Sequence, residues 1–542
     1  MYADGSNLKL LSRETNDYSR GIQLGGGSIV DWLPDEDGAV LMSRVYIPDE
    51  HTGSLIGSSK RGVGVDYVDT RTLQTRTVEP PKEGAVAYIS DGRGSVRVMG
   101  IKANPGATGQ DTGVIEYLYR TRDSQQWQKL SEYNGVDRTG FQPSTVDRDK
   151  NVVYGWKKLD GRLAVYAVSL DASLSEVLIS ARPDVDVDEF IHIGRRERMV
   201  GISFATETGR ASDLAADPDL QNLMASLAKA LPPQSELNVV DSSVDESKLL
   251  ILATRDNDPG TYYLFDRPAR KLRPLLAVRD ELSGVTLANV KAITYPAADG
   301  TRVPGYITFP AGKEDAEGLP AIVLPHGGPS ARDEWGFNWL AQFYAARGYV
   351  VLQPNFRGST GYGDAWYEKN GFKSWSDAIG DILDGGRWLE AQGIADPGKL
   401  GIVGWSYGGY AALQAAVTGP AVFKAVVAIA PVTDLDDLKE ESRHWSNHQL
   451  IGAFVGDEAN IGSASPARNA DKIKVPVLLF HGALDRNVAI GESQHMARSL
   501  KAAGVPHQLV TWDNLDHQLD DSNARADMLR KSDAFLRQAF GP

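Results

Sequence analysis

Short β-type runs fill the chain from about residue 20 to residue 285. Apolar and polar residues alternate in segments such as 64–68, and Gly, Asp and Asn separate the runs, as in half-buried strands joined by tight turns. A tyrosine recurs in the first strand of a hairpin at Tyr67, Tyr117, Tyr166 and Tyr262. The first three are spaced by about 50 residues and the last by about twice that, a period typical of β-propeller blades.

The tyrosine that is missing from this repeat falls where another pattern begins. Residues 214–231 carry apolar residues at helical spacing, so we expect a packed helix inserted in the repeat. A period of about 50 residues leaves room for only five to six blades. The ring is therefore predicted to be small and open, or to lack N-terminal blades. A β-sandwich with coincidental spacing is the alternative for this region.

The pattern changes near residue 285. Unbroken apolar runs then alternate with amphipathic stretches, which indicates a mostly parallel, doubly wound sheet with helices on both faces. We expect strands at 321–324, 349–353, 400–403, 425–429, 475–480 and 508–511, and helices at 375–392 and 490–503. The predicted architecture is a β-propeller-like domain, complete or incomplete, over residues 1–285, followed by an α/β-hydrolase domain over residues 286–542.

Composition excludes several classes of function. A chain of 542 residues is long enough for two domains. Its formal net charge of -14, without clustered Lys and Arg, argues against binding nucleic acid or an anionic membrane. It contains no cysteine, which excludes disulfides, thiolate metal sites and cysteine catalysis. We expect no cofactor and no metal.

The start of the chain suggests a location. Residues 1–5 are not a basic stretch that leads into an apolar run, as a signal peptide would be. Nor does any apolar stretch approach the roughly 18 to 20 residues of a membrane helix. We therefore expect a cytoplasmic protein, unless an N-terminal segment has been removed.

The motif Gly404-Trp405-Ser406-Tyr407-Gly408 follows a predicted strand and precedes a helix. G-x-S-x-G in this context is the turn that exposes a nucleophilic serine above the sheet edge, with glycines where chains approach closely. The backbone N–H of Tyr407, the next residue, is expected to stabilise the oxyanion.

A serine hydroxyl needs a base to take its proton and an acid to orient that base. Asp485 and His517 each follow a later predicted strand, which gives the order serine, acid, histidine that this fold uses. His481 is the alternative base, but it shares a short turn with Asp485 and is better placed to shape it. The alternative acids are the neighbours of His517, namely Asp513, Asp516 and Asp520, which rarely reach an imidazole in the required geometry.

A glycine-rich turn follows the predicted strand 321–324. It reads Pro325-His326-Gly327-Gly328-Pro329, a turn of the HGG type that supplies an oxyanion N–H. Because a base is already available, we expect His326 to be structural.

These motifs resemble the prolyl oligopeptidase family of serine peptidases, most closely its bacterial acylaminoacyl-peptidase and dipeptidyl-peptidase-like members. The resemblance is carried in order by residues 326–329, 355–363 and 404–409, and by His481-Gly482 with Asp485 and Val488. It covers about residues 285–540 well, and the N-terminal half only in architecture. It implies a triad of Ser406, Asp485 and His517, and oxyanion N–H groups from Gly328 and Tyr407.

The resemblance also implies a propeller that caps the hydrolase and admits oligopeptides rather than folded proteins. Some relatives have a substrate-contacting arginine two residues after the acid, where this chain has Asn487. A paired-glutamate motif for a free peptide N-terminus is not evident, although Asp188 and Glu189 form an acidic pair. His326 stands where the prolyl and dipeptidyl branches tend to have a tyrosine, which favours the acylaminoacyl branch.

The sequence therefore predicts a serine peptidase that acts on short peptides. Exopeptidase, endopeptidase and isopeptidase action all remain open. A carboxylesterase on the same triad is the nearest alternative, because esters form the same acyl-enzyme. A third reading is a peptide-binding scaffold with an inert hydrolase half. An open propeller ring would leak or pair with a second subunit to give a homo-oligomer.

Overall fold

The computed structural model describes residues 27–46, 60–103 and 109–541. The first residues of the chain, on which the expectation about location rests, lie outside these ranges. Among the described residues, we find no helix whose length and apolar character would let it cross a membrane.

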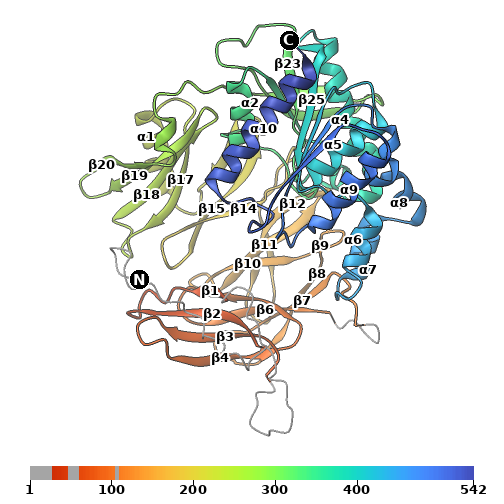
Figure 1. Ribbon diagram of the computed structural model, residues 1–542. Coiled ribbons are helices and arrows are strands. Elements are labelled where there is room, and N and C mark those ends of the chain that lie inside the picture. Colours follow the sequence, from red (N-terminus) through yellow and green to blue (C-terminus); the bar gives the residue numbers. More distant parts are fainter. Residues whose placement is uncertain (1–26, 47–59, 104–108, 542) are drawn as a thin grey trace.

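Five antiparallel sheets follow one another between Ser28 and Ala277 (Figure 1). The first contains β1 (Ser28–Asp31), β2 (Ala39–Tyr46), β3 (Gly62–Asp69) and β4 (Thr75–Lys82), and the second contains β5 (Ala85–Ser90), β6 (Val96–Lys102), β7 (Val114–Tyr119), β8 (Gln128–Asn134) and β9 (Thr139–Gly140). The third contains β10 (Gln142–Asp147), β11 (Val152–Leu159), β12 (Arg162–Ser169) and β13 (Glu176–Ser180). The fourth contains β14 (Glu189–Ile193), β15 (Arg198–Thr206) and β16 (Gly209–Asp213), and the fifth contains β17 (Glu236–Ser242), β18 (Lys248–Arg255), β19 (Asp258–Asp266) and β20 (Lys271–Ala277).

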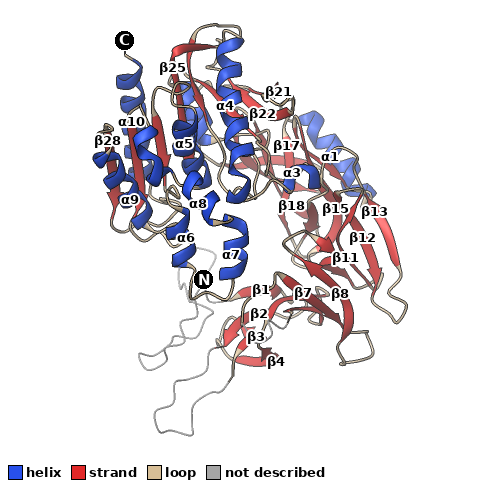
Figure 2. Cartoon of the chain, turned by 90° about the vertical axis from the view of Figure 1, so that its right-hand side faces the viewer, coloured by secondary structure: helices blue, strands red, loops and turns tan. Residues whose placement is uncertain are grey.

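The tyrosine repeat marks the same place in four of these sheets. The four tyrosines lie in β3, β7, β12 and β19, each the third strand of its sheet and the first strand of a hairpin. In the fourth sheet the third strand is followed by α1 (Pro218–Ala230), and Figure 2 shows this helix among the strands. The side chain of Asp217 caps α1 by accepting the Leu220 N–H at 2.9 Å. The predicted inserted helix is confirmed.

The turn between the first two strands of every sheet reaches one cavity of about 340 Å³. Its lining includes Pro34, Gly92, Asp149, Arg196 and Val244, one residue from each sheet in turn. Across this cavity, Arg196 of the fourth sheet forms an ion pair of 2.6 Å with Asp35 of the first. Sheets whose equivalent turns converge in this way are the blades of a propeller. Five blades are described, the lower of the two numbers expected.

The rest of the chain is built on one sheet of eight strands in the order β21-β22-β24-β23-β25-β26-β27-β28. Pairing is antiparallel from β21 to β24 and parallel from β24 to β28. The strands are β21 (Val290–Pro296), β22 (Arg302–Thr308), β23 (Leu319–Val323), β24 (Val350–Pro354), β25 (Ala395–Trp405), β26 (Val426–Ile429), β27 (Val477–Gly482) and β28 (His507–Trp512). All six strands predicted here are present.

Helices cover both faces of this sheet (Figure 2). One apolar core lies under α4, α5 and α9, and a second lies under α2 and α10. The helices are α2 (Trp339–Ala346), α3 (Asp364–Tyr367), α4 (Trp375–Ala391), α5 (Tyr407–Thr418), α6 (Leu435–Glu441), α7 (His448–Val455), α8 (Glu458–Ala464), α9 (Ile490–Ala502) and α10 (Ser522–Phe540), with 3₁₀ turns at Asp280–Leu282, Phe372–Ser374 and Pro466–Lys472. The doubly wound α/β prediction is confirmed.

The two halves meet through the opposite end of the blades. The Asp364 N–H donates to the Gly161 carbonyl at 2.7 Å, and the Asp186 N–H donates to the Gly361 carbonyl at 3.0 Å. Arg138 reaches both Asp186 and Asp364, and its guanidinium lies 4.0 Å from the ring centre of Tyr367. One motif that carries the family resemblance, residues 355–363, therefore leads directly into the junction with the propeller.

Candidate active site

Ser406 lies in the turn between β25 and α5. Its φ of 60° and ψ of -122° place a non-glycine residue in a strained conformation, which typically costs about 1 to 3 kcal/mol and occurs at functional sites. The Ser406 N–H donates to the Ile429 carbonyl at 2.8 Å, which fixes the turn to β26. A Cβ on Gly408 would lie only 2.2 Å from the Pro325 carbonyl oxygen, so a glycine is required where α5 passes the oxyanion turn.

Asp485 and His517 are in direct contact. His517 Nδ1 lies 2.6 Å from Asp485 Oδ2, and both side chains are buried. Asp485 Oδ1 accepts the backbone N–H groups of Asn487 and Val488 at 2.8 and 2.9 Å. Burial alone would raise the pKa of Asp485, but hydrogen bonds from His481, His517 and Val488 outweigh it and hold that pKa well below its usual value. The carboxylate is therefore ionised and can orient the imidazole.

The alternative acids do not contact His517 in this way. Asp513, Asp516 and Asp520 are exposed. Asp516 accepts the Gln518 N–H at 3.0 Å, and Asp520 pairs with Arg525 at 3.2 Å. The geometry favours Asp485, which the chain order also favours.

Three loops bring the nucleophile turn and the histidine together. Trp405, which precedes Ser406, donates its indole N–H to the His517 carbonyl at 3.0 Å. The Leu484 N–H donates to the Leu515 carbonyl at 2.9 Å, which joins the acid loop to the histidine loop. All three loops leave the carboxyl ends of neighbouring parallel strands, where open α/β sheets place their ligand crevice.

The HGG turn lies against the nucleophile. A Cβ on Gly327 would lie 3.5 Å from the Ser406 Cβ. The next residue, Gly328, is the predicted donor of one oxyanion N–H. Tyr407 begins α5, and the first N–H groups of a helix have no acceptor within it. Gly327 therefore lies beside the nucleophile and Tyr407 directly follows it, while Gly328 is one residue further along the turn.

His326 is fully engaged within this turn. Its Nδ1 lies 2.7 Å from the Gly327 carbonyl and its Nε2 lies 2.8 Å from the Ser359 hydroxyl. Burial lowers the pKa of His326 to about 4, so the ring is neutral at pH 7. Because a carbonyl only accepts, Nδ1 carries the proton. The Ser359 hydroxyl, which contacts Nε2, also donates to the Phe356 carbonyl at 2.7 Å. Both nitrogens are occupied, which supports the structural role expected for His326.

His481, the alternative base, lies behind the acid rather than beside the nucleophile. It is fully buried, and its Nε2 lies 3.2 Å from Asp485 Oδ2. Its place on the same short turn as Asp485 indicated a role in shaping that turn, but not this contact. The only feature of the sequence that pointed to this contact was the spacing of four residues between His481 and Asp485.

The acidic pair in the propeller is held by an arginine. Arg210 pairs with Asp188 and, at 3.1 Å, with Glu189, and it also pairs at 2.8 Å with Glu334 from the hydrolase half. The sequence did not predict this arginine. The pair therefore links the propeller to the loop after the HGG turn.

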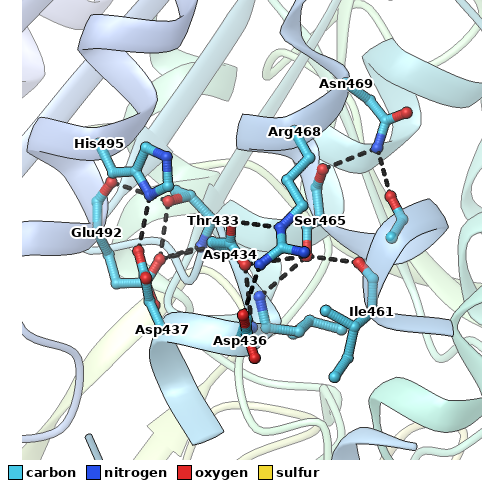
Figure 3. Close-up of polar contacts among 12 residues, drawn as sticks. Thr433, Asp434, Asp436, Asp437, Ile461, Ser465, Arg468, Asn469, Glu492 and His495 are labelled. Carbon is cyan, nitrogen blue, oxygen red and sulfur yellow. Dashed lines mark hydrogen bonds and ion pairs between the residues drawn. The ribbon is translucent and has the colours of Figure 1, made fainter. Parts of the chain in front are cut away.

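A second polar cluster lies behind the acid loop, between α6 and α9 (Figure 3). Glu492 Oε2 accepts the backbone N–H groups of Thr433 and Asp434 at 2.7 and 2.8 Å, and burial raises the pKa of Glu492 to about 8. Asp434, Asp437 and His495 converge closely enough to hold a metal ion. However, Asp437 pairs with His495 at 2.7 Å, and Asp434 pairs with Arg468 at 2.7 Å. The cluster therefore has internal partners for its charges.

Comparison with known proteins shows what this chain is similar to. Residues 335–542 match the model of the prolyl oligopeptidase family. Dipeptidyl aminopeptidase BIII of Pseudoxanthomonas mexicana is 27% identical over 434 residues, which cover 77% of this chain and 62% of that protein. Acylamino-acid-releasing enzyme 1 of Oryza sativa subsp. japonica is 26% identical over 268 residues, covering 47% and 34%.

A solved structure extends the likeness to both halves. The structure of a Mycobacterium tuberculosis puromycin-hydrolyzing peptidase superposes with a TM-score of 0.71 at 19% identity, covering 93% of this chain and 78% of that one. The chain spans 62% and 61% of the length of two of the curated relatives that it matches. Over residues 335–542 it carries a domain of the prolyl oligopeptidase family, on an α/β-hydrolase fold preceded by propeller blades.

Proposed function

We propose that the chain is a serine peptidase that hydrolyses short peptides through an acyl-enzyme at Ser406. The observation that carries this proposal is the 2.6 Å contact between His517 and an ionised Asp485, beside the strained turn of Ser406. The family match and the peptidases among the similar proteins support it. In this proposal, the residues after the boundary near residue 285 form the catalytic site, and the blades before that boundary cover it.

In this mechanism His517 Nε2 takes the Ser406 hydroxyl proton as Oγ attacks the scissile carbonyl carbon. Asp485 holds Nδ1–H and stabilises the imidazolium that forms. The oxyanion receives the N–H groups of Gly328 and Tyr407, each worth about 3 to 4 kcal/mol in the transition state. The amine leaves with the proton from His517, and a water activated by the same histidine releases the acid.

The substrate is proposed to be a short peptide, of the acylaminoacyl or dipeptidyl type. The named relatives include a dipeptidyl aminopeptidase and acylamino-acid-releasing enzymes. A free peptide ammonium would need carboxylate partners, and Asp188 and Glu189 are shared with Arg210. N-terminally blocked and free substrates must therefore be compared directly.

The test is a panel of chromogenic amides and esters, blocked and free, with Ser406→Ala as the control. Turnover of short peptide amides that is lost in the variant supports the proposal. Turnover of esters alone would identify a carboxylesterase. A wild-type protein that cleaves neither class and is not labelled by a fluorophosphonate would be an inert scaffold.

Size screening by the blades is a second part of the proposal. The blades contact the hydrolase half at the segment 360–364, close to the strand ends that carry the site. We expect cleavage of peptides up to about 30 residues and poor cleavage of the same sequence within unfolded casein, since a lid excludes bulky substrate. Equal kcat/KM for the two substrates would contradict size screening and leave the peptidase assignment intact.

A further inference from the structure

Asp485 has two histidine partners on one oxygen. Oδ2 lies 2.6 Å from His517 Nδ1 and 3.2 Å from His481 Nε2. His481 is on β27 and is fully buried, so it cannot reach a substrate. Its effect on catalysis must therefore pass through Asp485.

The surroundings of His481 fix its proton. Nε2 lies 2.9 Å from the Val488 carbonyl oxygen, which can only accept, so Nε2 must carry a hydrogen. That hydrogen bonds to the Val488 carbonyl, and Asp485 Oδ2 lies 3.2 Å from the same nitrogen as a longer second contact. Nδ1 lies 2.7 Å from the Ser493 hydroxyl, which donates to it. One arrangement of the ring hydrogens therefore gives both nitrogens of His481 a partner.

Three hydrogen bonds and one longer contact then hold this carboxylate. Asn487 N–H and Val488 N–H bind Oδ1, His517 binds Oδ2, and His481 Nε2 lies 3.2 Å from Oδ2. Rotation of the carboxylate would break all four contacts. Charge-assisted bonds of this kind are about twice as strong as neutral ones, so together they keep the group ionised and immobile.

Ser493, whose hydroxyl donates to His481 Nδ1, is itself anchored. Ser493 lies in the first turn of α9, next to Glu492, whose carboxylate binds the Thr433 side chain at 2.8 Å and the two N–H groups already described (Figure 3). The start of α9 is thereby tied to the loop after β26. The position of Ser493, and hence the tautomer of His481, depends on this attachment.

We propose that His481 is a positioning residue of the active site, which acts by donating Nε2–H to Asp485 while Ser493 fixes its tautomer. This rests on the proposed function, because the acid it positions is the acid of the proposed triad. The ring restrains Asp485 Oδ2, the oxygen that also contacts His517, so that the carboxylate stays directed at Nδ1 of the base.

The first test compares His481→Gln with His481→Leu. Glutamine can place an amide N–H near the position of Nε2, whereas leucine fills similar space without a donor. We expect the leucine variant to lower kcat by about 10- to 100-fold with KM changed by less than about threefold, as for other outer-shell partners. Glutamine should restore most of the loss. The control is His507→Gln on β28. Among the described residues, the contact of the His507 ring is the one between Nδ1 and the Val505 carbonyl.

The pH dependence of kcat/KM distinguishes a positioning role of His481 from a purely structural role. Without the His481 donor, the carboxylate attracts the His517 proton more strongly, so the acid limb of kcat/KM should move to higher pH in the leucine variant and return with glutamine. Equal loss in both variants, or a leucine variant with wild-type kcat and an unmoved limb, would overturn the proposal.

If His481→Leu does not fold, the variant Ser493→Ala tests the same proposal. It removes the donor to Nδ1 and should give a smaller loss of kcat with the same direction of pH shift. Imidazole ¹⁵N shifts of His481 report its tautomer without substrate, so they separate failure of this inference from failure of the peptidase assignment. A wild-type His481 protonated on Nδ1 alone would overturn the inference even in an active enzyme.

Discussion

The indole N–H of Trp405 donates a hydrogen bond of 3.0 Å to the carbonyl oxygen of His517. Trp405 is the last residue of β25 and His517 lies in the loop after β28, so this bond spans the two strands between them. It links the main chain of the proposed base to the residue before the proposed nucleophile. The distance between the proposed base and the proposed nucleophile therefore depends partly on Trp405, which is not a member of the triad.

Trp405→Phe should lower kcat by about 10-fold, because it removes this hydrogen bond and keeps an aromatic ring. The ring of Trp405 lies 6.4 Å from that of Trp339, and phenylalanine can preserve part of this contact. Steady-state kinetics and thermal unfolding check the prediction. A loss of stability that accounts for the lost rate would argue against it.

Ser406→Ala should abolish turnover and leave the fold intact. The hydroxyl supports no core packing, and the loss in kcat is expected to be about 10⁴- to 10⁶-fold, with a residual rate from the oxyanion donors. Fluorophosphonate labelling followed by peptide mapping identifies the reactive serine. A variant that keeps a tenth of the wild-type rate, or a label on another serine, would refute the assignment.

Asp485→Asn should lower kcat by about 10⁴-fold, because an amide cannot hold Nδ1–H of His517 in the required tautomer. Asp516→Asn and Asp513→Asn are the matched controls, since both residues are exposed. Each should stay within about twofold of the wild type. A larger loss at Asp516 than at Asp485 would show that the acid has been assigned wrongly.

Gly482→Ala should impair activity by moving the histidine loop. A Cβ there would lie 2.4 Å from the Leu515 carbonyl oxygen and 2.5 Å from that of Asp516, so the backbone beside His517 must shift. A displacement of about 1 Å can lower kcat by about 100-fold. Gly491→Ala in α9 is the control, because no atom lies within 4 Å of its Cβ position. If the two variants behave alike, the steric argument fails.

Glu492→Gln should remove part of the pH dependence of stability. Burial raises the pKa of Glu492 to about 8, above its value in the unfolded chain. The folded protein therefore keeps a proton that the unfolded chain releases, and the free energy of unfolding falls as pH rises from about 4.5 to 8, by at most about 1.4 kcal/mol per pH unit.

Glutamine cannot lose a proton, so the variant should become more stable relative to wild type across this window. Denaturant unfolding at several pH values measures the difference. Glu458→Gln, at an exposed position of α8, is the control and should show no such trend. A constant difference between Glu492→Gln and wild type at all pH values would contradict the prediction.

Much of the fold could be predicted because its signals are local. A buried parallel strand is a short apolar run, so β23 to β28 were found with errors of one to a few residues at their ends. Asp485 and His517, which lie in contact in the structure, could be proposed from the sequence because each follows such a run. The tyrosine repeat located the third strand of four sheets, since those residues occupy equivalent positions in successive blades.

The remaining features depend on contacts between distant segments. Glu492 reads as an ordinary polar residue of an amphipathic helix, and its burial arises from a loop 59 residues earlier. The donor from His481 to Asp485 requires α9 to place Ser493 behind β27. The pairing of Arg210 with Asp188 and Glu334 likewise depends on how the two halves meet. A single-sequence pattern contains no signal for such packing.

The blade sheets and the eight-stranded sheet also differ in the stage of folding at which they can form. Each blade joins strands that are consecutive in the sequence, whereas the eight-stranded sheet places β24 between β22 and β23 and must wait for β25 to β28. Local pairings form faster than distant ones, and N-terminal units fold first during synthesis. A chain emerging from the ribosome therefore builds its blades before Ser406, Asp485 and His517 can meet. The blades, which we propose cover the site, would thus form before the proposed nucleophile can act.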